Sequence, residues 1–264
     1  MRNLENVTMA VTHTGIFHTD DVFSAALLKL LKGNDFPIIR VADATEYLNR
    51  DEYIVFDIGY GEFDHHQDGS PVRENGIPYA AFGLLWRAYG HLVVNDISSI
   101  DEMLCQPIDS HDNGVDKNPL SQTISCFIPP WDSNDEMDTA FFRAVDIAVI
   151  LLRNIIASDS QYDRSDAAAP KYAEKSIDAG YPVSIIVMDR YVPVSSIAKY
   201  TDARFMIYPS RRGGYNAQVV SRQDDVVVFP DDVATNEFVS FVAKGNWLIG
   251  SDNKDKLAAY CASL

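Results

Sequence analysis

Short apolar runs and helix-like apolar repeats alternate along the first half of the chain. Runs rich in β-branched residues predict buried strands at 7–12, 37–42 and 53–58. An apolar repeat that follows Asp20 and Asp21 and stops at Gly33 predicts a helix, because aspartate caps helix starts and glycine ends helices. A second helix is predicted over 79–89. This alternation is typical of an α/β fold in which helices cover a parallel sheet.

The pattern changes after a long, mostly apolar helix predicted over 135–159. A polar segment follows at 158–170, and a further helix is predicted over 171–178. The remaining chain predicts short strands at 183–188, 204–208, 215–220 and 226–229. We therefore expect two domains, 1–160 and a smaller α/β domain 183–264, joined by a connector at 161–182, with a catalytic cleft between them. The apolar 135–159 helix also suggests a homodimer.

Charge narrows the choice of partners. The 264 residues include 22 Lys and Arg and 38 Asp and Glu, which gives a formal net charge of −16. Such a surface repels long polyanions, so binding to long duplex nucleic acid is not expected. Bound metal ions could still provide positive charge at a phosphate-handling site.

Cysteine usage and hydropathy indicate the compartment. Three widely spaced cysteines form no C-x-x-C pair, so neither a disulfide framework nor a zinc knuckle is predicted. No stretch approaches the roughly 20 apolar residues that cross a bilayer, and the first residues do not resemble a signal peptide. We expect a cytoplasmic protein that does not enter the membrane.

All six histidines lie within the first 111 residues, and most neighbour aspartates at the predicted ends of strands or helices. The first cluster, H-T-G-I-F-H-T-D, contains His13, His18 and Asp20. The second, D-I-G-Y-G-E-F-D-H-H, contains Asp57, Asp64, His65 and His66. The third, D-S-H-D-N-G, contains Asp109 and Asp112.

These clusters are expected to meet at one edge of the sheet, because ligands of parallel sheets gather at the carboxyl ends of the strands. Several carboxylates in one crevice repel each other unless cations lie between them. Imidazole with carboxylate suits Mn²⁺, Fe²⁺, Co²⁺ or Zn²⁺, whereas sites made only of oxygen suit Mg²⁺ and Ca²⁺. The residues therefore predict a site for two divalent metal ions that share one carboxylate.

The runs T-H-T-G-I-F-H-T-D-D, F-D-H-H-Q and D-S-H-D-N-G resemble motifs of the Myg family of metal-dependent hydrolases. The Asp64-His65-His66 run, with Asp57 after a strand, also resembles the wider DHH phosphoesterase superfamily. These motifs cover about the first 115 residues. Where many DHH enzymes have an aspartate, this chain has His18.

The resemblance implies a role for each matching residue. His13 and His18 would bind the first metal, Asp20 and His65 the second, and Asp57 would bridge the two. An aspartate of the third motif would complete the second site; we assign Asp109 and keep Asp112 as the alternative ligand. The catalytic residues would be Asp57, His66, which would contact a phosphate oxygen, and Asp64, which would orient the imidazoles. Mn²⁺ is the expected metal, with Mg²⁺, Co²⁺ or Zn²⁺ as alternatives.

In the second half, S-R-R-G-G-Y predicts an anion-binding turn formed by Arg211, Arg212, Gly213 and Gly214. Glycine allows close backbone approach, and arginine binds phosphate with two parallel hydrogen bonds. DHH enzymes use a glycine-rich substrate motif in their second domain, although the typical G-G-G-H run is absent here. A basic hairpin turn without a ligand is the alternative. Trp131 and Trp247 could stack on a base or simply pack in a core or interface.

The predicted function is that of a metal-dependent phosphoesterase. The resemblance implies an exonuclease-like enzyme that cleaves short single-stranded RNA or DNA from one end. The alternatives are a phosphatase of small substrates such as pyrophosphate or a dinucleotide, a metal-binding protein without turnover, and a hydrolase of a bond without phosphorus.

Overall fold

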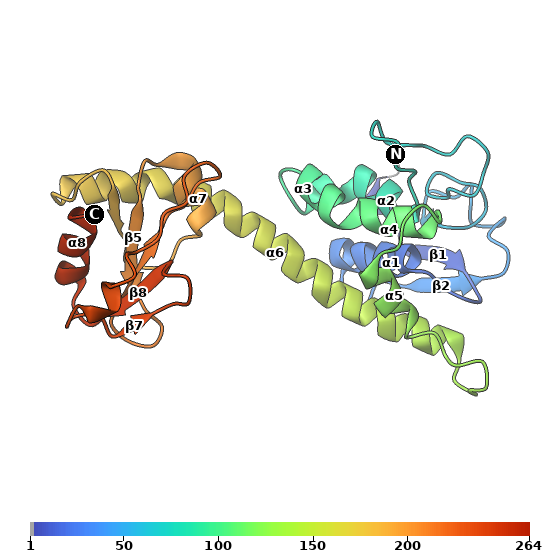
Figure 1. The fold of residues 1–264 in the computed structure, drawn as a ribbon. Helices are drawn as coiled ribbons and strands as arrows, with labels where there is room; N and C mark the ends of the chain where they lie inside the picture. Colours follow the sequence, from blue (N-terminus) through green and yellow to red (C-terminus); the bar gives the residue numbers. More distant parts are fainter. Residues whose placement is uncertain (1–2) are drawn as a thin grey trace. The chain divides into compact units, whose positions relative to one another are not determined.

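The computed structural model describes residues 3–264, which form two compact units. The first unit ends at Asp159 and the second is Ser160–Leu264 (Figure 1). The boundary lies within one helix, α6 (Met137–Asp178), which has 42 residues. The predicted 135–159 helix therefore begins at Met137 and continues through the polar segment and through Pro170, which lies inside the helix. Among residues 3–264, no helix combines the length and the apolarity that crossing a bilayer requires.

The first unit contains a three-stranded parallel sheet in the order β2-β1-β3. Its strands are β1 (Met9–His13), β2 (Ile38–Val41) and β3 (Tyr53–Val55). Ala10 of the central strand pairs with Ile38 on one side and Ile54 on the other. The predicted parallel sheet and its three strands are confirmed.

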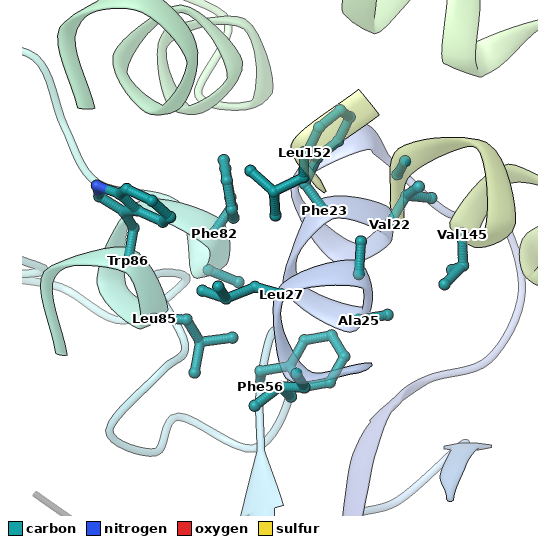
Figure 2. Packing of buried hydrophobic residues seen from close by; sticks show 14 of the residues in the cluster. Val22, Phe23, Ala25, Leu27, Phe56, Phe82, Leu85, Trp86, Val145 and Leu152 are labelled. Atoms are coloured by element: carbon teal, nitrogen blue, oxygen red, sulfur yellow. The ribbon is translucent and has the colours of Figure 1, made fainter. Parts of the chain in front are cut away.

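Helices cover one face of this sheet. They are α1 (Thr19–Lys32), α2 (Ala81–Tyr89), α3 (Ser98–Ile100), α4 (Gln106–Asp112) and α5 (Pro119–Ser125), together with the first part of α6. Figure 2 shows α1 at the centre of the core, with Leu27 near the side chains of α2 and Phe56, and Val145 and Leu152 of α6 nearby. Because side chains alternate along a strand, Val11 points to the opposite face and packs in a smaller cluster with Val55.

The second unit contains a five-stranded sheet in the order β4-β5-β6-β8-β7. Its strands are β4 (Ile185–Val187), β5 (Phe205–Pro209), β6 (Tyr215–Val219), β7 (Phe241–Val242) and β8 (Leu248–Ser251). The strand predicted at 226–229 is wrong: this segment is irregular, and its buried Phe229 stacks on Phe205. Only Val227 and Phe229 of this run are buried, whereas Val226 and Val228 are exposed, so an alternating pattern arises here without strand pairing.

Helices pack on both faces of this second sheet. Helix α8 (Lys254–Ala262) buries Leu257 against the face that carries Ile207 and Ile249. The other face carries Met206 and packs with Ala169 of α6 and with Ile197 of α7 (Val194–Tyr200). The two faces therefore have separate apolar clusters.

Candidate metal centre

The site is built at the carboxyl ends of the neighbouring strands β1 and β3. His13 is the last residue of β1, and Asp57 follows β3 by two positions. Because the strands are parallel, both side chains are delivered to one edge of the sheet. Asp57 has a φ of 55°, a left-handed conformation that is costly for a residue other than glycine. A strained backbone at this position marks it as a functional candidate.

The buried Asp57 carboxylate contacts imidazoles from two segments. Its Oδ2 lies 3.2 Å from Nε2 of His13, and its Oδ1 lies 3.1 Å from Nε2 of His65. Nδ1 of His66 is 3.7 Å from the same Oδ1. The two oxygens of one carboxylate thus face ring nitrogens on different sides, an arrangement suited to a ligand shared by two cations.

Hydrogen bonding selects the nitrogen of His13 that faces the site. Its Nδ1 lies 3.0 Å from the carbonyl oxygen of Thr14, which can only accept, so Nδ1 carries the proton. Its Nε2 lies 3.0 Å from Oδ2 of Asp21 as well as near Asp57. A histidine that donates one N–H to a backbone carbonyl and points its other nitrogen at carboxylates has the orientation of a metal ligand.

A second group forms at the first turn of α1. Asp20 is fully buried, and its Oδ2 accepts the N–H of Ala81 at 3.3 Å and lies 3.9 Å from Nε2 of His65. Oδ2 of Asp112 lies 3.1 Å from the same nitrogen, and its Oδ1 lies 3.5 Å from Nδ1 of His18. The end of α4 therefore brings Asp112 to the groups supplied by α1 and by the loop after β3.

The charges in this cluster are poorly balanced. Burial by itself lowers the pKa of both inner imidazoles, but the surrounding carboxylates raise the pKa to about 11 for His13 and about 10 for His65. Burial, together with repulsion from Asp57 and Asp112, raises the pKa of Asp20 well above its ordinary value. Both effects follow from excess negative charge in a buried place, which bound cations would relieve.

The donor atoms fit divalent cations. Potential ligand atoms form three sets, and the atoms within each set lie within 4.8 Å of one another. The first set comes from His13, His18, Asp21 and Asp57; the second from Asp57, His65 and His66; and the third from His18, Asp20 and Asp112. Three buried atoms of these sets are in no hydrogen bond: Oδ1 of Asp20, and Oδ1 of Asp57 and Nε2 of His65, which contact each other only as an ion pair. Buried polar atoms normally have partners, so these atoms are suited to coordinate an ion.

Asp64 positions His66 at the edge of this cluster. The Asp64 carboxylate is buried, accepts the backbone N–H of Tyr60 at 2.6 Å, and lies 2.7 Å from Nδ1 of His66. The His66 side chain is 53% exposed. A buried carboxylate therefore orients an imidazole that remains open to a ligand.

Asp109, which we assigned as a metal ligand, lies away from these donor sets. It is fully buried, its Oδ2 accepts a hydrogen bond from Arg73 at 2.8 Å, and its Oδ1 accepts the N–H of Gly83 at 3.1 Å. One helical turn separates it from Asp112 on α4, and the two side chains contact different groups. The alternative, Asp112, is the aspartate that meets His65 and His18.

The predicted anion-binding turn lies in the other unit, between β5 and β6. Ser210 N–H donates to the carbonyl oxygen of Gly214 at 2.9 Å, and the guanidinium groups of Arg211 and Arg212 are exposed. Gly214 has a φ of 65°, and a Cβ there would lie 2.6 Å from the carbonyl oxygen of Ser251, so glycine is required. The turn therefore places two exposed arginines next to Gly214, where the backbone of Ser251 approaches closely.

The sequence analysis missed two buried charged residues, Asp21 within the donor sets and Arg73 beside Asp109. Asp21 was interpreted only as a helix cap; it accepts the N–H of His18 at 2.8 Å, but it also contacts His13. Arg73 lies in a loop without a motif, and only the structure shows it beside Asp109. Asp21 could have been recognised because it adjoins a candidate ligand, whereas no local signal pointed to Arg73.

One protein-family model matches most of the chain. The model of the family MYG1_exonuc, described as an uncharacterised protein family (UPF0160), matches residues 9–229. A MYG1 protein of Schizosaccharomyces pombe is 24% identical over 229 residues, which are 72% of this chain and 69% of that protein. No solved structure matches the chain.

Other relatives match a shorter stretch. The human MYG1 exonuclease is 27% identical over 178 residues, 52% of this chain and 46% of its own length. A MYG1 protein of Dictyostelium discoideum is 32% identical over 130 residues, 41% of this chain and 39% of its own. The chain thus matches less than half the length of these two relatives. Because the family model covers most of this chain, including the whole histidine and aspartate cluster, the protein belongs to the MYG1_exonuc family.

Proposed function

We propose that the protein is a phosphoesterase of the DHH type that uses two divalent metal ions, and that it removes nucleotides from one end of short single-stranded RNA or DNA. The observation that carries this proposal is the Asp57 carboxylate, whose two oxygens face imidazoles on different sides and which is shared by two of the three donor sets. Nuclease chemistry is supported by relatives named exonucleases.

Each half of the cluster has residues to hold one ion. His13, His18 and Asp57 would hold the first, and Asp20, His65 and Asp112 would hold the second together with Asp57. The lack of a hydrogen bond at Oδ1 of Asp20, Oδ1 of Asp57 and Nε2 of His65 supports these assignments. When bound, two such ions neutralise phosphate charge and generate a nucleophile from water at neutral pH. Manganese is the expected metal, since mixed imidazole and carboxylate donors suit it.

The protein's own groups would then act on the phosphate. His66, oriented by Asp64 and open to solvent, can donate a hydrogen bond through Nε2 to a phosphate oxygen when its ring is protonated. Charge develops on those oxygens in the transition state, so a fixed donor there lowers the barrier. Because the Asp64 carboxylate is buried, it holds the His66 ring in this orientation before any substrate binds.

Hydrolysis of a substrate panel tests the function. The purified protein is stripped with a chelator, supplied with Mn²⁺ or Mg²⁺, and incubated with pyrophosphate, dinucleotides and short labelled single-stranded RNA and DNA. We expect mononucleotides to be released in sequence from one end of the oligonucleotides, and only with metal present. Hydrolysis of pyrophosphate alone would favour the small-substrate alternative. Metal binding without any hydrolysis would contradict enzymatic function.

Replacement of His66 by alanine should separate metal binding from turnover. We expect metal content to remain as in the wild type and kcat to fall by about 100- to 1,000-fold, the range for loss of one transition-state donor. Elemental analysis and steady-state kinetics check the two parts. The exposed Asp68, two residues further along the same loop, provides a matched control as Asp68→Ala. Loss of metal in His66→Ala would instead make His66 a ligand.

A further inference from the structure

One face of the second sheet carries a pocket of about 770 Å³, a size common for ligand sites. Strand pairing places Tyr208, Asn216, Gly250 and Phe241 side by side in one row across β5, β6, β8 and β7. All four residues line the pocket. The floor of the pocket is therefore a short row of side chains on the sheet, supplied by four different strands.

Gly250 opens the middle of this floor. A Cβ at this position would lie 3.3 Å from Cβ of Phe241 and 3.8 Å from Oδ1 of Asn216. Its φ is not in the left-handed region, so backbone conformation does not require glycine here. The absent side chain instead leaves a hollow between an aromatic ring and an amide. A flat group could enter there and reach the Asn216 amide, which can both donate and accept hydrogen bonds.

Large aromatic side chains around the hollow remain open to solvent. Tyr191 is 50% exposed, Phe241 51% and Trp247 46%. Tyr191 meets Tyr208 edge to face, with ring centroids 5.1 Å apart, whereas Phe241 and Trp247 have no ring partner among the described residues. Burying such rings is favourable, so aromatic faces left open within one pocket indicate a flat partner.

The rim of the same pocket carries charge. Arg211 and Arg212 line it, and neither guanidinium forms an ion pair within the described part of the chain. The carboxylate of Asp252 also lies at the rim. Two adjacent arginines at one turn, neither neutralised by a carboxylate, provide a local site for an anion in a chain of net charge −16.

We propose that this pocket binds one nucleotide of a single-stranded nucleic acid, with the base stacked between aromatic rings over Gly250 and the neighbouring phosphates at Arg211 and Arg212. Aromatic faces beside arginines match a molecule in which flat rings alternate with phosphates. Base faces are accessible only in unpaired strands, so duplexes are excluded. The inference extends the proposed function, because it assigns single-strand selection to a pocket outside the metal centre.

Binding without metal tests this proposal. Anisotropy of a labelled single-stranded oligonucleotide is measured with the full chain in EDTA, beside an abasic sugar-phosphate oligomer of equal length. Trp247→Ala removes a stacking face, and Gly250→Val fills the hollow. Trp131→Ala is the matched control, because this tryptophan is 97% exposed in the first unit and lies outside the pocket. Thermal unfolding of each variant confirms that it folds.

We expect Trp247→Ala to weaken oligonucleotide binding by about 5- to 150-fold, the range for loss of one base-stacking ring. Gly250→Val should weaken it similarly, Trp131→Ala should match the wild type, and the abasic oligomer should bind weakly to all. Arg211→Ala should weaken both ligands. Equal binding of both ligands by the wild type, or unchanged binding by Trp247→Ala and Gly250→Val, would overturn the inference. Base-dependent binding without metal-dependent hydrolysis would refute the proposed function alone.

Discussion

Replacement of Asp57 by asparagine is expected to abolish metal-dependent hydrolysis and to weaken the binding of both ions. The two oxygens of Asp57 face different imidazoles, and asparagine keeps the size but removes the charge and one oxygen acceptor. Loss of a residue that only hydrogen-bonds to a metal ligand lowers the affinity for the metal by about 10- to 100-fold. Losing a shared ligand should therefore cost each ion more than about 100-fold.

Metal stoichiometry after equilibrium dialysis against Mn²⁺ measures this effect. We expect two ions per chain in the wild type and none in Asp57→Asn at the same free concentration. Asp112→Asn should lose one ion, because we assign Asp112, which lies 3.1 Å from Nε2 of His65, to the second ion alone. Asp68→Asn, which neutralises an exposed carboxylate nearby, should retain both. Two ions retained by Asp57→Asn would refute the shared-ligand assignment.

Replacement of Gly83 by alanine should destabilise the first unit strongly. In an open helical position this change usually stabilises by about 0.5–1 kcal/mol. Here a Cβ would lie 1.8 Å from Oδ2 of Asp109 and 2.6 Å from Nη2 of Arg73. The pair would have to separate inside the core, and a broken buried pair costs about 3–5 kcal/mol. Urea unfolding should therefore show a lower midpoint.

A double mutant tests whether a clash with Asp109 causes the destabilisation by Gly83→Ala. Asp109→Ala alone should also destabilise, because it leaves the buried guanidinium of Arg73 with only Asp101 as an acidic partner. If the clash is the cause, adding Gly83→Ala to Asp109→Ala should cost little more, so the two effects will not add. Additive losses, or a raised midpoint in Gly83→Ala alone, would show that the ion pair tolerates the extra methyl group.

The local pattern identified much of the first unit. Apolar runs predicted β1, β2 and β3, and Gly33 predicted the end of α1, because these signals depend on neighbours in sequence. The N-cap of α1 is His18, and the aspartates predicted to cap it lie in its first turn. The strand predicted at 226–229 failed because an irregular segment can also bury alternate side chains: Val227 and Phe229 are buried here without strand pairing. The short strands β7 and β8 depend on pairing with distant segments and gave too little local signal.

The sequence by itself determined which residue types could hold metal, since His13, His18, Asp20, Asp57 and His65 stand in recognisable motifs beside predicted strand and helix ends. Only the tertiary structure shows which of the two aspartates of α4 lies beside the histidines. Both lie on one short helix, but Arg73 and the N–H of Gly83 hold Asp109 in the core, whereas Asp112 meets His65. A motif specifies side-chain chemistry, whereas the partner that each carboxylate meets depends on segments brought together by folding.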